Sequence, residues 1–294
     1  MKKRDTGSLD RVDRSVPGGT RGILRPRTGL ERFEVERIAP GPALAPFVAH
    51  FWVLRWDLRG RPPHRQQVLT RPSVHLTFTS YLTSGTTRAR IAGVVRDEFV
   101  EEIHGEGRVV GAAFRPGGFR PFTDAPVAAL TGRFARPDEV FGAAGLALAD
   151  DVFAAASAED GVARLEAFLA AAAPEPDPMA ERAASVVARI AERPGLVRVD
   201  ELAAEEGLSV RALQRLFHEY VGIGPKWVIR RFRMQEAAER AASGTAEDWA
   251  GLAAELGYAD QAHFTRDFTA AVGTPPARYA REAGRGGAPG SIDA

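Results

Sequence analysis

The sequence contains no cysteine and no long hydrophobic run. The first absence excludes disulfides, thiolate metal sites and cysteine nucleophiles. The second excludes a membrane-spanning helix, which needs about 18 apolar residues in a row. The charged N-terminus is not followed by an apolar stretch, so we expect no signal peptide. These absences suit a protein of the reducing cytoplasm without a membrane partner.

The sequence also has little net charge, +1 over 294 residues. A chain of this length is expected to form roughly two domains. Positive charge is concentrated in residues 211–240, where Glu219, Glu236 and Glu239 are the only acidic residues. The basic residues of this stretch are Arg211, Arg215, Lys226, Arg230, Arg231, Arg233 and Arg240. We expect them to form a basic stripe that binds phosphate.

Motifs of catalysis are missing as well. There is no Ser-His-Asp pattern, no paired carboxylates and no H-x-H metal pair. The six histidines are His50, His64, His75, His104, His218 and His263. We expect each to be hydrogen-bonded or exposed, although the first four could converge on a metal from separate strands. The run GEGRVVG at 105–111 is not followed by a helix, as a dinucleotide loop would be, and predicts a hairpin turn. We therefore expect no enzyme, no cofactor and no metal.

The C-terminal third contains one pattern written twice. Residues 199–225, VDELAAEEGLSVRALQRLFHEYVGIGP, align with residues 249–276, WAGLAAELGYADQAHFTRDFTAAVGTPP. The matched pairs are Leu202 with Leu252, Ala203 with Ala253, Gly207 with Gly257, Leu213 with Phe264, Arg215 with Arg266, Phe217 with Phe268, Val221 with Val272 and Gly222 with Gly273. Two copies are too few for a solenoid and indicate a pair of similar helical modules.

Each copy has the order of features found in a helix-turn-helix. A small alanine lets the next helix approach, and Gly207 or Gly257 is expected to take φ > 0 in the turn. Ser209 or Asp260 then caps a second helix. Apolar residues at i, i+4 place one face of that helix in the core. The expected DNA-facing residues are Arg211, Gln214, Arg215 and His218 in the first copy and Gln261, Ala262, Thr265 and Arg266 in the second.

These side chains suit major-groove reading, because Arg pairs with guanine and Gln with adenine. The first copy offers three long donors, whereas Ala262 can at most touch a thymine methyl and Asp267 would repel phosphate. We therefore expect the first copy to discriminate bases and the second to add affinity through Gln261 and Arg266. Two alternatives remain: Arg215 is a backbone anchor with Gln214 as the reader, or both hairpins belong to another all-α domain.

Residues 199–282 resemble the DNA-binding domain of the AraC/XylS transcription regulators. The resemblance rests on the runs SVRALQRLFHEYVGIGP, FRMQEAAERA and YADQAHFTRDF…VGTPPARYARE. It implies a sequence-specific regulator that binds double-stranded DNA through both modules, and that engages RNA polymerase if it is an activator. Relatives that repair alkylated DNA use cysteine, which this chain lacks.

Residues 31–116 are β in character. Short runs rich in Val, Ile, Phe and Thr alternate with turn signals, as in a sandwich or barrel. These runs are FEVERI, FVAHFWVLRWDL, QQVLTR, SVHLTFTS, RIAGVV, EFVEEI and RVVGAAF. Three stretches (LAPFVAHFWVLRW, PPHRQQVLTRPSVHLTF and RVVGAAFRPGGFRPF) are similar to a poorly characterised N-terminal domain of actinobacterial-type AraC relatives. In many AraC-type regulators such a domain senses a ligand or dimerises.

Candidate effector-pocket residues are Trp52, Trp56, Arg115 and Phe119. The two tryptophans share one strand face and are either core or pocket wall. The RPGGFRPF run at 115–122 forms either a ligand mouth or a corner from barrel to helix. Residues 119–172 are helical and Ala-rich, and they either form a homodimer interface or pack on their own barrel.

The expected architecture is α+β. A β-barrel or sandwich-like domain with accessory helices (30–172) precedes an all-α double helix-turn-helix domain (179–283). The second domain contains modules at about 199–222 and 249–273, joined by a helix over 225–243, with a capping box of Thr245 and Asp248 before the second module. Residues 173–178 are a proline-rich linker; a basic tail (1–29) and a Gly-rich tail (284–294) are expected to be disordered.

The sequence therefore predicts a transcription regulator that binds DNA and responds to a small-molecule effector. In one alternative the β-rich domain only dimerises or binds a protein. In another, an enzyme carries an appended DNA-binding module.

Overall fold

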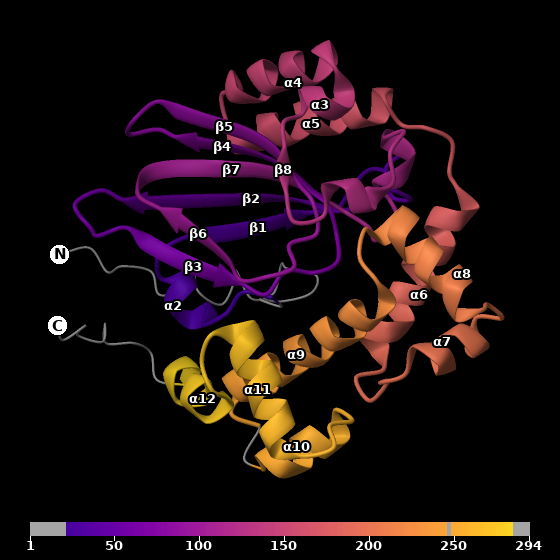
Figure 1. Ribbon diagram of the computed structural model, residues 1–294. Coiled ribbons are helices and arrows are strands. Elements are labelled where there is room, and N and C mark those ends of the chain that lie inside the picture. Colours follow the sequence, from indigo (N-terminus) through magenta and orange to yellow (C-terminus); the bar gives the residue numbers. More distant parts are fainter. Residues whose placement is uncertain (1–21, 246–247, 285–294) are drawn as a thin grey trace.

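The computed structural model describes residues 22–245 and 248–284 of the chain (Figure 1). The N-terminal half is built on an antiparallel six-stranded sheet in the order β1-β2-β7-β4-β5-β8. Its strands are β1 Glu34–Ile38, β2 Val48–Leu58, β4 His75–Tyr81, β5 Thr86–Ala92, β7 Gly105–Phe114 and β8 Phe134–Ala135. A separate two-stranded sheet pairs β3 His64–Val68 with β6 Phe99–Ile103. Each of the seven predicted strand runs overlaps a strand, although RIAGVV and QQVLTR are strand only in their first halves, and the two-residue β8 was not predicted.

Side chains alternate between the two faces of the six-stranded sheet. On β2, Phe51 and Val53 are fully buried on one face, while Trp52 and Trp56 share the other. Trp52 pairs with Gly111 across the sheet and Trp56 pairs with Gly107. A Cβ on either glycine would lie within 3.0 Å of the indole above it, so glycine is what lets each ring lie flat on the sheet.

Three helices cover the first face of the sheet, as Figure 1 shows. They are α3 Asp138–Phe141, α4 Ala143–Phe153 and α5 Ala158–Ala171. Leu148, Val152 and Leu165 join Phe51 and Phe78 in one core cluster. These helices therefore pack against their own sheet, which was one of the two expected arrangements.

Two local predictions in the N-terminal half are wrong. The stretch 105–107 is not a hairpin turn, because β6 pairs with β3 and β7 pairs with β2 and β4. Gly105 instead takes φ 58° where the chain passes from one sheet to the other. The predicted disordered tail, residues 1–29, also extends too far along the chain. Residues 22–30 are ordered, with Ile23 bridged to Val68 and α2 over Pro26–Leu30; the rest of that tail and residues 285–294 lie outside the described residues.

The C-terminal half is helical. It comprises α6 Pro178–Glu192, α7 Val199–Glu205, α8 Val210–Leu216, η3 Phe217–Val221, α9 Pro225–Ser243, α10 Trp249–Glu255, α11 Gln261–Val272 and α12 Pro276–Gly284. Helix α9 has the predicted bounds, and both turn glycines have positive φ, 63° at Gly207 and 72° at Gly257. The expected capping box is absent: Asp248 itself caps α10, and Thr245 donates to the Arg240 carbonyl.

Helix α9 joins two separate hydrophobic cores. Its first half packs with α6, α7 and α8 through Val228, Ile229 and Phe232. Its second half packs with α10, α11 and α12 through Met234, Ala237 and Ala241. Each core also takes in side chains of the N-terminal half, Val94 in the first and Leu24 and Leu69 in the second. Side chains of the N-terminal half therefore complete both cores of the helical half.

Candidate nucleic-acid interface and ligand cavity

Helix α8 presents the polar face that the first module would offer to DNA. The helix begins after Ser209, whose Oγ accepts a hydrogen bond from the Ala212 backbone N–H at 3.1 Å. Leu213 and Leu216 are buried, which turns the opposite face outward. Arg211, Gln214 and Arg215 are exposed on it, and His218 is exposed in η3 directly after the helix. Within the described part of the chain, none of these four has a hydrogen-bond or ion-pair partner.

Helix α11 is the corresponding element of the second module. Asp260 accepts a hydrogen bond from the His263 backbone N–H at 2.6 Å and caps the helix. Phe264 and Phe268 are buried. Gln261, Ala262 and Arg266 are exposed, and Thr265 is half-buried. Both modules thus place an arginine at the matched outward position, Arg215 in one and Arg266 in the other.

The basic stripe is smaller than the sequence predicts. Arg231 and Arg233 are buried at 7% and 8% exposure, because different parts of the protein cover the two sides of α9 on which they lie. The Arg231 guanidinium stacks on Trp227 at 4.4 Å and donates to the Arg96 carbonyl at 2.7 Å. Arg233 lies 3.9 Å over the Tyr258 ring.

Ion pairs remove two more charges from the stripe. Arg230 pairs with Asp267 at 2.6 Å, and Arg240 pairs with Glu236 and Glu255. Only Arg211, Arg215 and Lys226 of the predicted stripe are exposed and without a carboxylate partner among the described residues.

Asp267 is a brace rather than a source of repulsion. Its side chain is only 16% exposed. One carboxylate oxygen pairs with Arg230 of α9, and the other accepts a hydrogen bond from the Tyr258 hydroxyl at 3.0 Å. Burial raises the pKa of Tyr258 to about 12, so the hydroxyl keeps its proton and remains a donor. The carboxylate therefore ties recognition helix α11 to α9 instead of facing solvent.

The two recognition helices lie at opposite ends of α9 (Figure 1). Helix α9 has 19 residues, and at the α-helical rise it is about 28 Å long. Successive major-groove faces of B-DNA are about 34 Å apart. The length of α9 is of the same order as this spacing.

Three polar contacts attach the first module to the N-terminal half and to the residue that caps α6. Thr131 donates from its hydroxyl to the Gly222 carbonyl at 2.6 Å. The Arg120 guanidinium pairs with Glu219 at 2.7 Å. Tyr220 donates to Asp177, directly before α6, at 2.8 Å. These contacts surround η3, the turn that follows recognition helix α8.

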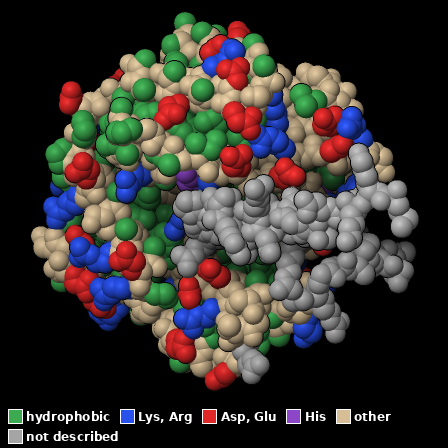
Figure 2. Space-filling view, turned by 180° about the vertical axis from the view of Figure 1, so that it is seen from behind, with side chains coloured by type: hydrophobic (Ala, Val, Ile, Leu, Met, Phe, Trp, Pro, Cys, Tyr) green, Lys and Arg blue, Asp and Glu red, His purple; other side chains and the backbone are tan. Residues whose placement is uncertain are grey.

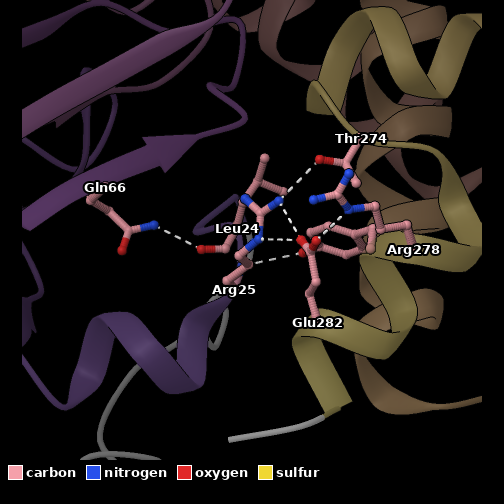
Figure 3. Close-up of polar contacts among 7 residues, drawn as sticks. Leu24, Arg25, Gln66, Thr274, Arg278 and Glu282 are labelled. Atoms are coloured by element: carbon pink, nitrogen blue, oxygen red, sulfur yellow. Dashed lines mark hydrogen bonds and ion pairs between the residues drawn. The ribbon is translucent and has the colours of Figure 1, made fainter. Parts of the chain in front are cut away.

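The second module is held by the N-terminal segment (Figure 3). The Arg25 guanidinium reaches Glu282 of α12 at 2.8 Å and the Thr274 hydroxyl at 3.1 Å. Arg25 takes φ 50°, the only positive φ of a non-glycine residue in the described chain. Its neighbour Leu24 accepts a hydrogen bond from the Gln66 side chain at 2.8 Å, which fixes the segment to β3.

A cavity of about 970 Å³ lies between the two halves of the chain. Its floor is the face of the six-stranded sheet that carries Trp52, and β3 and β6 form the opposite wall. Helix α6 contributes Ala184, Ser185 and Ala188, and α9 contributes Phe232. In the space-filling view from behind, a histidine and basic side chains lie beside a hydrophobic area (Figure 2). The volume is at the upper end for pockets that bind small molecules.

Two histidines line the cavity at equivalent places on β2 and β4, the strands on either side of β7. His50 and His75 both pair with Ala113 of β7, one from each side. Burial, together with the positive charge of Arg37, lowers the pKa of each to about 4. Both rings are therefore neutral at pH 7. Neither histidine was expected to line a pocket, although their strand parity, shared with Trp52 and Thr77, could have indicated it.

The structure divides the four expected pocket residues. Trp52 and Arg115 line the cavity. Trp56 does not; it is packed with Phe33 and Leu58, and its indole N–H donates to the His104 carbonyl at 2.9 Å. Phe119 is 1% exposed in the core under the helices. The run 115–122 is the corner from sheet to helix, where Gly117 takes φ 85° against the backbone of α6.

The described residues contain no group of three His, Asp or Glu placed to hold a metal ion. No helix in the described part of the chain is long and apolar enough to cross a membrane.

Comparison with known proteins gives two family matches. Residues 36–136 match a domain of unknown function (DUF6597), and residues 202–282 match a helix-turn-helix domain. No curated protein matches the chain.

Solved structures give weaker likenesses. The C-terminal domain of AraT, a response regulator from Geobacillus stearothermophilus, is 25% identical over 37% of this chain and 88% of its own, with a TM-score of 0.32. ToxT from Vibrio cholerae O395, bound to (E)-4-(8-methylnaphthalen-1-yl)but-3-enoic acid, is 9% identical over 86% of this chain and 99% of its own, with a TM-score of 0.41. At such TM-scores nothing about the function of this chain follows from these likenesses.

The duplicated modules, their capped recognition helices and the matched family model agree on the same residues. The chain carries an AraC-type helix-turn-helix domain over residues 202–282.

Proposed function

We propose that the protein is a sequence-specific transcription regulator that binds double-stranded DNA with α8 and α11. The observation that carries the proposal is the pair of exposed arginines, Arg215 and Arg266, at matched positions of two capped helices. Arginine binds guanine or phosphate, and an ion pair or hydrogen bond within the protein would have prevented either contact. Neither arginine has a partner within the described residues.

The two modules have unequal roles in this proposal. Helix α8 supplies most of the base discrimination, because Arg211, Gln214 and Arg215 are long donors on one exposed face. Helix α11 adds affinity through Gln261 and Arg266. Ala262 offers only a methyl group, and Thr265 is short and half-buried. The assignment would be reversed if removal of the Arg266 side chain changed the selected bases and removal of the Arg215 side chain did not.

The test is selection of bound sequences from random DNA by the full chain. The full chain is required because Val94 and Leu69 of the N-terminal half belong to the cores of the DNA-binding half. The wild type is expected to enrich a defined site, and the double variant Arg215→Ala/Arg266→Ala to lose it. Arg59→Ala, at an exposed turn remote from both modules, serves as the control. A wild-type protein that folds but enriches no sequence at any salt concentration would contradict the proposal.

The N-terminal half acts as an effector sensor in this proposal. The cavity has walls from both halves, so a bound molecule would touch α6 and Phe232 as well as the sheet. A ligand that contacts both halves changes their relative stability and thereby the DNA-competent population. The rival function, pure dimerisation through α4 and α5, has less support because most of their large apolar residues pack on the sheet and only Leu146 of these two helices is a strongly exposed one. An effector must shift the thermal unfolding of the full chain and change its DNA affinity; dimerisation alone predicts neither.

A further inference from the structure

His263 is an exposed side chain of recognition helix α11 that the proposed contacts of the second module do not include. Its side chain is 51% exposed, and it lies one turn from Arg266 along the helix. In the first module the matched position is Ala212, because Phe264 pairs with Leu213 in the duplicated pattern. The second copy therefore carries a ring with two nitrogen atoms where the first copy carries a methyl group.

Two neighbours hold the imidazole of His263 in place. The ring lies edge-on to the Tyr258 ring, with the ring centres 5.1 Å apart and the planes at 89°. Its Nε2 is 3.9 Å from the Asp267 carboxylate, one turn further along α11. Tyr258 and Asp267 are themselves joined by the hydrogen bond that braces the helix. Because the ring already has a defined place, little side-chain entropy is lost when it contacts a partner.

His263 borders the face of α11 that would meet DNA. Phe264 and Phe268 are buried, so the exposed Ala262 and Arg266 point away from the core, and His263 is next to them around the helix. The centre of such a face reaches base edges, whereas its flank is next to the sugar-phosphate backbone that forms the wall of the groove. The place of His263 therefore suits a contact with phosphate.

The charged and titratable groups around His263 come from α11, from the turn before it and from α9. These groups are Asp267 and Arg266 on α11, Tyr258 in the turn, and Arg230 and Arg233 on α9. Arg230 pairs with Asp267 at 2.6 Å, so the charge of this carboxylate is matched without His263. Arg233 lies 3.9 Å over the Tyr258 ring and adds a second cation nearby. An additional anion that favours a charged imidazole has to come from a bound partner, and a DNA phosphate is such an anion.

We propose that His263 takes up a proton when α11 binds DNA and then holds a backbone phosphate, so that DNA affinity rises as the pH falls from about 8 to about 6. The inference rests on the proposed function and adds proton-dependent affinity to the second module. A charged imidazole donates a charge-assisted hydrogen bond to the phosphate, which a neutral ring cannot do. Because the complex then binds one more proton than the separate molecules, its affinity must increase as the pH falls, by at most about tenfold per pH unit.

Other histidines provide the comparison. His50 and His75 are buried and have pKa values of about 4, so they stay neutral throughout this pH range. His104 is exposed between β6 and β7 in the N-terminal half. His218 is exposed after α8, and its neighbour Glu219 already pairs with Arg120.

The test measures the affinity of the full chain for the site that it selects from random DNA, at about pH 8 and about pH 6 and one salt concentration. The wild type is expected to bind about five- to tenfold more tightly at the lower pH. His263→Gln is expected to bind at both pH values as the wild type does at the higher one. His263→Arg, which keeps its charge, is expected to bind at both as the wild type does at the lower one. His104→Gln is the matched control and keeps the full pH dependence.

Salt dependence gives a second readout that a structural role would not change. The slope of log affinity against log salt concentration is expected to be steeper at the lower pH by about 0.9, the value of one phosphate, and His263→Gln is expected to remove this difference. The substituted positions are exposed, so the variants are expected to fold.

Three outcomes overturn the proposal: the wild type binds equally at both pH values, His263→Gln keeps the wild-type pH dependence, or His218→Gln alone abolishes it. Specific DNA binding that does not depend on pH rejects proton uptake and leaves the proposed function standing. Absence of specific binding at every pH rejects the proposed function and this inference together.

Discussion

The two helix-turn-helix modules share a backbone plan and differ in how their recognition helices are held. Helix α11 is a regular helix of 12 residues, braced to α9 through Asp267 and Tyr258. Helix α8 has seven residues and continues into the π-helical turn η3, which is attached to the N-terminal half instead. One helix is positioned from within the DNA-binding half and the other from outside it. A signal from the N-terminal half would therefore reach α8 more directly than α11.

The largest difference is expected at the matched glycines that end the two helical segments. Gly222 and Gly273 take φ 89° and 78°, so alanine strains both by about 1–2 kcal/mol. At Gly222 a Cβ would also lie 3.0 Å from Val127 Cγ1 and 3.1 Å from the Val127 carbonyl oxygen, whereas the nearest atom at Gly273 is 3.8 Å away. We expect Gly222→Ala to lower the free energy of unfolding by about 2–4 kcal/mol and Gly273→Ala by about 1–2 kcal/mol. Urea denaturation of both variants measures this; equal losses would mean that the contact around η3 is loose.

The next effect concerns DNA affinity. Arg215→Ala is expected to cost about 1–3 kcal/mol of binding and to relax the preference at one or two base pairs. Arg266→Ala is expected to weaken binding evenly across sequences, because a phosphate contact carries no sequence information. Site selection by both variants at one salt concentration separates the two. The contrast between the modules disappears if both profiles keep the wild-type preferences.

A smaller effect tests the brace of α11. Asp267→Asn removes the ion pair with Arg230 and weakens the hydrogen bond from Tyr258, and we expect a loss of about 1 kcal/mol in stability. A double-mutant cycle with Arg230→Gln is expected to give a coupling energy of about 0.5–1 kcal/mol. Thermal unfolding of the four proteins of the cycle gives this energy. Additive effects would show that the pair does not position α11.

The smallest effects are expected where each module meets the N-terminal half. Arg120 pairs with Glu219 beside η3, and Arg25 pairs with Glu282 on α12. Both pairs are roughly a third exposed, so each contributes less than about 1 kcal/mol. Hydrogen exchange is a sensitive readout of such local changes. Arg120→Ala is expected to speed exchange in α8 and η3, and Arg25→Ala in α12; the reverse pattern, or uniform change, would contradict separate attachments.

Much of this architecture could be predicted because it depends on local patterns. The caps Ser209 and Asp260, the turn glycines and the strand parity of Trp52 and Trp56 each follow from neighbouring residues. The burial of Arg231 and Arg233 could not be predicted, because their covers, the Arg96 carbonyl and the Tyr258 ring, come from other elements. Nor could the ordering of residues 22–30, since the partners of Arg25 lie some 250 residues away in the chain. The cavity residues on β1 and β4 could not be predicted either, because that prediction requires the order of the strands in the sheet.

The burial of α9 bears on the thermodynamics of DNA association. Each phosphate that a protein cation neutralises releases condensed counterions, and the slope of log affinity against log salt concentration falls by about 0.9 per phosphate. The predicted stripe of seven cations, together with Arg266, would give a slope of about −7. The described structure leaves Arg211, Arg215, Lys226 and Arg266 exposed and without a carboxylate partner. These four cations limit their own contribution to about −3.6. Such a regulator would retain more of its affinity at high ionic strength than the arginine content of its linking helix suggests.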